Sequence, residues 1–126
     1  MLFRGVRPPV DYRLCNQTVT LYHWDSANDT CTRKVIEKGA FLDFRTASNV
    51  DKTGSKEVNS FLLIIPGDLP LQNGDRVFAG IGPEVTDWER FIPASVEALF
   101  EISFVKPCFW DGELIHWEAG NRKETL

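Results

Sequence analysis

The two histidines of the chain, His23 and His116, are the first residues to consider for chemistry. Each follows an alternating pattern of apolar and polar residues, and each is followed directly by a tryptophan. Neutral imidazole is a common zinc ligand, so the two rings would form a metal site if their strands were neighbours. We find no thiol or carboxylate at a ligand spacing beside either histidine. We therefore predict that both pack structurally and that the chain holds no metal.

The three cysteines, Cys15, Cys31 and Cys108, form no C-x-x-C pair. A disulfide framework would leave one of them over, so we expect reduced thiols. Cys108 stands close enough to His116 to suggest a thiol nucleophile. The sequence marks no oxyanion hole and no orienting acid, and a small buried cysteine is the commoner outcome. We predict no catalytic cysteine.

Other motifs fall short of known sites. The run from Asp51 to Lys56 lacks the G-x-x-x-x-G-K-[ST] spacing of a phosphate loop, and 68–75 lacks the terminal glutamate of a calcium loop. Acidic residues around 111–118 are expected to be solvated, although a hydrolase with paired carboxylates stays open because spatial pairing is invisible in a sequence. The sequence thus predicts no enzyme and no cofactor.

Size and composition favour one folded domain. The chain has 126 residues, of which 43% are hydrophobic and 25% charged, as in an ordinary globular protein. A net charge of -4 argues against a general nucleic-acid binder, because phosphate contacts need clustered cations. No apolar run approaches the roughly 20 residues of a membrane span, and the N-terminus lacks the apolar region of a signal peptide. We expect folding in the cytoplasm of a bacterial host.

Charge is unevenly distributed along the chain. Arg4, Arg7 and Arg13 make the first fourteen residues net positive, whereas 84–101 is negative. Complementary potentials set the register and rate of docking, so this polarity suits a protein that binds partners or copies of itself. A merely solvated acidic face is the alternative.

Three regions are expected along the chain. Residues 1–14 contain two adjacent prolines and no apolar period, which predicts an extended N-terminal arm. Such an arm either frays or lies along a neighbouring subunit. A single β domain is expected over 15–120, and 121–126 form a polar tail.

Strands are predicted from alternating apolar residues at 18–24 and from the apolar run 61–65, which suits a strand buried on both faces. The segment 33–44 predicts two short strands, or one bulged strand that kinks at Gly39. Residues 45–59, polar and glycine-containing, are predicted as a loop, either a plain hairpin tip or a binding loop.

The second half adds a short strand at 77–79 and a terminal hairpin, with strands near 100–105 and 114–119. Apolar spacing over 88–100 predicts a short helix or an irregular connection. The fold class is therefore mostly β: a small antiparallel barrel or sandwich with at most one short helix.

Exposed aromatic residues are candidates for interface anchors. The chain contains four tryptophans and nine phenylalanines, and most should be core. Phe109 and Trp110 fall at a predicted hairpin tip, where an aromatic side chain suits a buried contact with a partner. The predicted interface residues are Arg4, Arg7, Arg13, Asp51, Lys52, Lys56, Trp88, Glu89, Phe109 and Trp110.

Five segments occur in a characteristic order over about residues 17–119: TVTLYH, RKVIEKGAF, SFLLIIP, GDRVFAG and LIHWEA. This series resembles a family of small tailed-bacteriophage proteins described as minor capsid or head-to-tail joining proteins. Each segment alone is weakly specific, and their order and spacing carry the resemblance. The arm and the connection over 84–99 fall outside it.

The resemblance implies a virion component without catalytic activity, similar to the stopper or head-closure proteins that form rings below the portal. The implied partners are identical subunits, portal or adaptor proteins and tail proteins. DNA would only pass through the channel, and no membrane is involved. Loop 45–59 would face the channel or the adjoining ring, and the arm would reach a neighbour. A minor capsid protein elsewhere on the head and a non-viral β-barrel adaptor or binding module are the alternatives.

Overall fold

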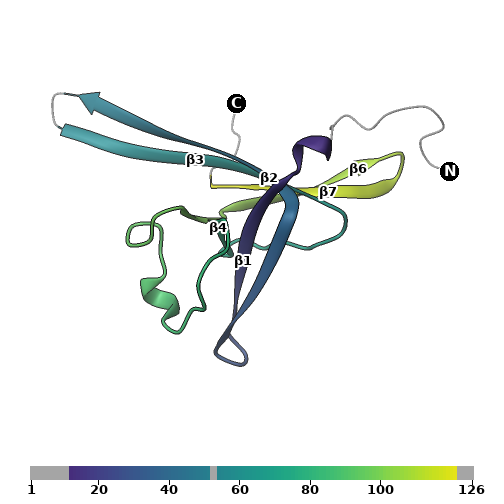
Figure 1. The fold of residues 1–126 in the computed structure, drawn as a ribbon, viewed down its shortest axis with the longest axis horizontal. Helices are drawn as coiled ribbons and strands as arrows, with labels where there is room; N and C mark the ends of the chain where they lie inside the picture. The colour runs from purple at the N-terminus through teal and green to yellow at the C-terminus, as the bar shows by residue number, and fades with distance from the viewer. Residues whose placement is uncertain (1–11, 52–53, 122–126) are drawn as a thin grey trace.

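The described part of the chain folds into seven antiparallel strands and two short 3₁₀ turns (Figure 1). The computed structural model describes residues 12–51 and 54–121, and their side chains outside 45–59. The sheet order is β5-β4-β1-β2-β3-β7-β6, which confirms the predicted mostly β class. The elements are η1 (Tyr12–Leu14), β1 (Gln17–Asp25), β2 (Thr30–Asp51), β3 (Gly54–Pro66), β4 (Arg76–Ala79), η2 (Trp88–Arg90), β5 (Leu99–Glu101), β6 (Phe104–Trp110) and β7 (Glu113–Gly120).

The sheet curls because two segments of chain each belong to both of its halves. Strand β2 pairs with β1 up to Ala40 and with β3 from Phe41 onward. The segment 99–110 forms both edges of the sheet, since β5 pairs with β4 and β6 pairs with β7. Strands that bend from one half into the other make the corners of such a structure. The result is a half-barrel whose two edges are joined by continuous chain.

A bulge in β2 produces one of these corners. Val19 pairs with Ile36 and Gln17 with Ala40, so two steps along β1 face four along β2. Lys38 takes the left-handed conformation there, with φ 52°, and its backbone N–H donates to the Thr18 hydroxyl oxygen. The alternative of one bulged strand is therefore the correct one. The positive φ falls on Lys38 rather than on the predicted Gly39.

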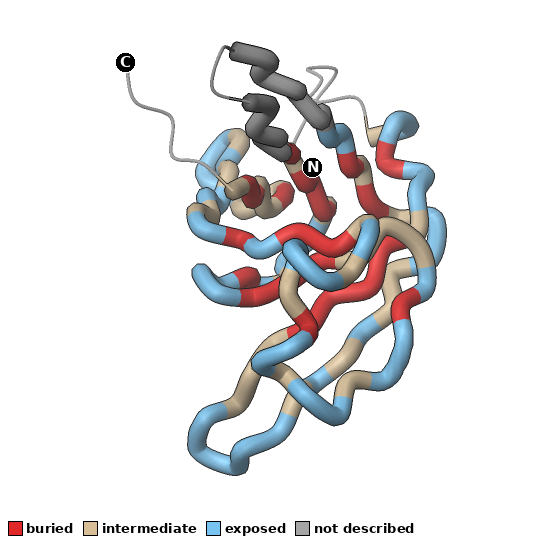
Figure 2. The backbone as a smooth tube through the Cα atoms, turned by 90° about the vertical axis from the view of Figure 1, so that its left-hand side faces the viewer, coloured by how far each residue is buried: buried red, intermediate tan, exposed pale blue. Residues whose placement is uncertain are grey.

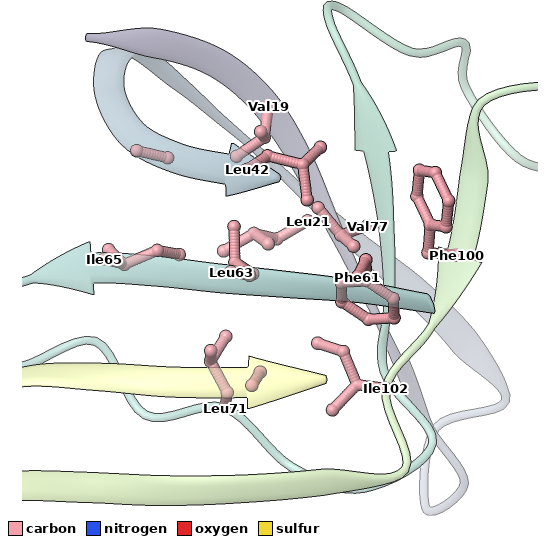
Figure 3. Close-up of a cluster of buried hydrophobic side chains, with 12 residues drawn as sticks. Val19, Leu21, Leu42, Phe61, Leu63, Ile65, Leu71, Val77, Phe100 and Ile102 are labelled. Carbon is pink, nitrogen blue, oxygen red and sulfur yellow. The ribbon is translucent and has the colours of Figure 1, made fainter. Parts of the chain in front are cut away.

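The main core fills the inside of the curled sheet (Figure 3). Side chains from alternate positions of β1, β2, β3 and β7 point into it, as the period of two requires. Its fully buried members include Val19, Leu63 and Val77. In the apolar run of β3, Leu63 faces this core while Ile64, on the opposite face, is also buried. Buried residues concentrate in the middle of the molecule, and many exposed residues lie in the connections at its periphery (Figure 2).

A second cluster packs the connection 80–98 against the outer face of the sheet. Tyr22, fully buried, contacts Phe91 edge-on and donates its hydroxyl hydrogen to the Pro83 carbonyl. Arg76 donates to the carbonyls of Trp88 and Phe91. The Trp88 carbonyl also accepts the backbone N–H of Phe91, which closes the turn η2. Of the predicted alternatives for 88–100, the irregular connection forms: it contains the 3₁₀ turn η2 and a single turn in which the Ile92 carbonyl accepts the backbone N–H groups of Ser95 and Val96.

The predicted loop 45–59 is wrong in extent. Strand β2 continues to Asp51 and β3 begins at Gly54, and the two stay paired from Phe41 opposite Ile64 to Asp51 opposite Gly54. Pairing of backbone groups does not require apolar side chains, so a polar sequence did not end the strands. The hairpin extends away from the rest of the sheet (Figure 1).

Candidate functional site

The terminal hairpin of β6 and β7 gathers three side chains with metal-binding or proton-transfer chemistry. Cys108 on β6 stands opposite His116 on β7, and Glu118 follows two residues later on the same face. Ala119 of β7 lies in the core, so this face is the outer one. The Cys108 sulfur, a His116 ring nitrogen and a Glu118 carboxylate oxygen all lie within 4.8 Å of one another.

The turn η1 covers this group from outside. The Tyr12 hydroxyl oxygen lies 2.5 Å from Nδ1 of His116, and the two rings meet edge-on with centroids 5.6 Å apart. The turn closes through the backbone N–H of Cys15, which donates to the Tyr12 carbonyl. As a result His116 is only 2% exposed, although it lies on the outer face of the sheet.

Hydrogen bonding fixes the orientation of the imidazole. Its Nε2 lies 2.9 Å from a carboxylate oxygen of Glu118. A carboxylate only accepts, so a neutral ring carries its hydrogen on Nε2 and accepts the Tyr12 hydroxyl hydrogen at Nδ1. Tyr12 thus donates a hydrogen bond to His116, and His116 donates one to Glu118, so both ring nitrogens are hydrogen-bonded.

The thiol of Cys108 is not activated as a nucleophile. Burial, the charge of Glu118 and a hydrogen bond to Glu118 together raise its pKa to about 11. Burial likewise raises the pKa of Tyr12 to about 12, with smaller contributions from Cys15, Cys108 and Glu118. A catalytic cysteine needs a lowered pKa and an imidazole nitrogen available as base. This arrangement provides neither of the two requirements for thiol catalysis.

The prediction that no thiol or carboxylate accompanies a histidine is wrong. His116 and Glu118 are two residues apart in an alternating strand, and this spacing places both on one face. The turn predicted between the last two strands brings Cys108 opposite His116. These two signals were present in the sequence. The contact with Tyr12 was not, because 104 positions separate the two residues.

His23 forms a separate site. Its Nδ1 lies 2.7 Å from the buried carboxylate of Asp75, which also accepts the backbone N–H of Gln72. His23 and Asp75 border a groove of about 250 Å³ between β1, β2 and the segment 69–71. Strands β1 and β7 are not adjacent in the sheet. The predicted alternative of a metal site shared by His23 and His116 is therefore not what the structure forms.

The predicted interface residues lie at several places. Phe109 is 61% exposed near the tip of the terminal hairpin, Trp110 is half-buried, and both Glu89 and Arg13 are exposed. Asp51 and Lys56 lie on the strands of the β2–β3 hairpin, where the side chains are not described, and Arg4, Arg7 and Lys52 lie outside the described residues.

Trp88 is engaged within the chain. Its ring stacks on Trp24, with centroids 5.7 Å apart, and the Arg76 guanidinium carbon lies 3.7 Å from the Trp88 ring centroid. These contacts hold the connection 80–98 on the sheet.

In comparisons with known proteins, no protein-family model, no curated protein and no solved structure matches this chain. Within residues 12–51 and 54–121, no helix is long and apolar enough to cross a membrane.

Proposed function

We propose that this chain is a structural component of a tailed-phage virion at the head-to-tail interface, where copies of it form a ring with portal or adaptor and tail proteins. The ordered series of segments between 17 and 119 that resembles small phage joining proteins supports the assignment. The structural observation that supports it best is the β2–β3 hairpin that extends from the half-barrel (Figure 1).

This hairpin, here called the ribbon, comprises residues 43–61. Within the ribbon β2 and β3 pair only with each other among the described strands, because β1 pairs with β2 no further than Ala40 and β7 pairs with β3 only from Leu62. A two-stranded hairpin in water is marginally stable. Its outer edges also present backbone groups that another chain can pair with. Contact with a neighbouring subunit would stabilise the ribbon and use those groups.

The rest of the molecule supplies a rigid base for the ribbon. The ring of Phe44, at the root of the ribbon, packs at a tilt against Phe100 with ring centroids 5.1 Å apart, and Phe100 packs equally closely on Phe61. Gln17 exchanges two hydrogen bonds with the backbone of Leu42 just before the ribbon. The ribbon is thus fixed in direction at its root, as a contact element in a symmetric ring must be.

Exposed Phe109 offers a second contact point. It lies near the tip of the terminal hairpin, where a register shift interrupts the β6–β7 pairing between Cys108 and Phe109. A large aromatic ring held outside the core is the kind of side chain that anchors protein interfaces. Two separated contact surfaces on one subunit are what a head-to-tail ring requires.

A shortened ribbon tests the proposal. Replacing residues 46–59 by Asn-Gly joins Arg45 to Ser60, which already face each other in the register, through a turn suited to a hairpin. We expect the shortened protein to keep its circular dichroism spectrum and to lose both ring formation and binding to portal or adaptor rings. Lys34→Ala, at an exposed body position, serves as the control and should assemble normally. Assembly of the shortened chain like the full chain would exclude the ribbon as the contact.

A further inference from the structure

We propose that Cys108, His116 and Glu118 form a transition-metal site that prefers zinc, with Tyr12 as the positioning residue behind the histidine. This site is independent of the proposed virion role. One thiol, one imidazole and one carboxylate from a single hairpin supply it, and their donor atoms lie within 4.8 Å of one another.

The distances suit a small ion. Zinc binds sulfur at about 2.3 Å and nitrogen or oxygen at about 2.0–2.2 Å, so the donors around a tetrahedral zinc lie roughly 3.3–3.6 Å apart. Side-chain rotations bring the three donors to that spacing, because they already share one face of two paired strands. Strand β7 lies between β3 and β6 in the sheet, so its backbone is held on both sides.

The donor types select the class of metal. A thiolate and an imidazole favour zinc and similar ions, whereas calcium and magnesium prefer all-oxygen sites. Three protein ligands leave the fourth position of a tetrahedral zinc for a water molecule. In a surface group that is merely solvated the histidine would be exposed, whereas His116 is buried under η1.

Tyr12 meets the requirement for an outer partner of the histidine. A metal-bound imidazole usually presents its second ring nitrogen as a donor to a neighbouring oxygen. The Tyr12 hydroxyl can accept from Nδ1–H as well as donate to it, so it suits both states of the ring. On metal binding the ring hydrogen moves from Nε2 to Nδ1, Glu118 turns its carboxylate from Nε2 to the ion, and the Cys108 proton passes to water.

Cobalt(II) titration of the full chain tests the site, because a thiolate bound to cobalt gives a charge-transfer absorption that oxygen and nitrogen ligands do not. We expect one cobalt per chain with that absorption, and zinc should displace it. Cys108→Ser should abolish the absorption, while the matched variant Cys31→Ser should keep it, since Cys31 packs in the second cluster. Absence of the absorption in the unaltered protein overturns the proposal, as does its loss in Cys15→Ser but not in Cys108→Ser.

Two further variants keep the test decisive if Cys108→Ser does not fold. Glu118→Gln should weaken zinc binding at least tenfold. Tyr12→Phe, which leaves every ligand in place, should weaken it about 10- to 100-fold while the cobalt charge-transfer absorption keeps its position at saturation. Unchanged zinc affinity in Glu118→Gln removes the carboxylate from the site and overturns the proposal as stated.

Discussion

The hydroxyl oxygen of Tyr12 lies 2.5 Å from Nδ1 of His116, although the two residues are 104 positions apart in the chain. Through this contact the beginning of the described chain is attached to its last strand. His116 continues the connection to Glu118, 2.9 Å from Nε2. The turn η1 is therefore part of the fold rather than part of an extended arm, which corrects the prediction for residues 12–14. Residues 1–11 lie outside the described part.

Removing the Tyr12 hydroxyl should destabilise the protein. In Tyr12→Phe the buried Nδ1 of His116 loses its hydrogen-bond partner, which typically costs about 1–3 kcal/mol. Urea denaturation measures the loss of unfolding free energy. Phe109→Tyr, which adds a hydroxyl group to an exposed ring, should change it by less than about 0.5 kcal/mol. Equal stabilities of Tyr12→Phe and the unaltered protein would show that the hydroxyl contact contributes nothing.

The two tyrosines should resist ionisation at alkaline pH. Burial is the largest cause that raises the pKa of Tyr12 to about 12 from 10.0, and burial also raises the pKa of Tyr22. The folded state therefore holds these protons more tightly than the unfolded state above pH 10. Stability from both phenols is complete below pH 10 and decreases as the pH rises through the folded pKa.

Tyrosinate absorbance and circular dichroism, followed together against pH, check this prediction. Both tyrosines of the chain are described, so the signal has no other source. We expect little tyrosinate at pH 10.5 and a later rise that accompanies unfolding. A tyrosine ionising with a pKa near 10 while the dichroism stays native would contradict the burial of its hydroxyl group.

Gly82 should tolerate no side chain. A Cβ atom built there would collide with the Tyr22 hydroxyl oxygen and lie 3.0 Å from the Phe78 ring. Gly82→Ala should therefore displace the connection 80–98 and cost about 1–3 kcal/mol. Thermal unfolding measures this loss of stability. The control is Ile81→Ala, which truncates a neighbouring side chain that is 64% exposed. A loss in Ile81→Ala as large as that in Gly82→Ala would refute the steric explanation.

Arg76 should not be replaceable by lysine. The buried Arg76 guanidinium donates to the carbonyls of Trp88 and Phe91 and lies over the Trp88 ring. An ammonium group lacks the planar shape for these contacts, so Arg76→Lys should cost about 1–3 kcal/mol and alter tryptophan fluorescence.

The matched control for Arg76 is Arg90→Lys. The Arg90 side chain is 89% exposed and makes one ion pair with Asp87, so its replacement should shift stability by less than about 0.5 kcal/mol. Identical fluorescence spectra for Arg76→Lys and the unaltered protein would argue that Arg76 does not hold Trp88 in place.

Local patterns predict much of this fold. The alternation in 18–24, the apolar run in β3 and the terminal hairpin all appear as strands, because burial of one or both faces leaves a period in the sequence. The bulge at Lys38 carries no such period. It depends on hydrogen bonds that the backbone N–H groups of Lys38 and Leu42 donate to the side chains of Thr18 and Gln17 on the neighbouring strand, and these are set by the register.

The site and the ribbon contain features that local sequence patterns do not predict. Glu118 is placed beside His116 by alternation alone, and Cys108 by the hairpin turn. Tyr12 reaches them only through tertiary packing, which a spacing cannot show. The ribbon continues through a polar segment because backbone pairing, not side-chain burial, extends it. The apolar spacing over 92–99 predicts a helix, but Val96 and Leu99 pack in the second cluster with Tyr22 from an irregular connection.

The central claim, that copies of this chain form a ring at the head-to-tail junction, is tested most directly by cryo-electron microscopy of the neck of phage particles that encode it. We predict a ring of half-barrels below the portal, with each β2–β3 ribbon lying against the next subunit. A neck without density for this fold, in particles that also lack the protein by mass spectrometry, would contradict the account.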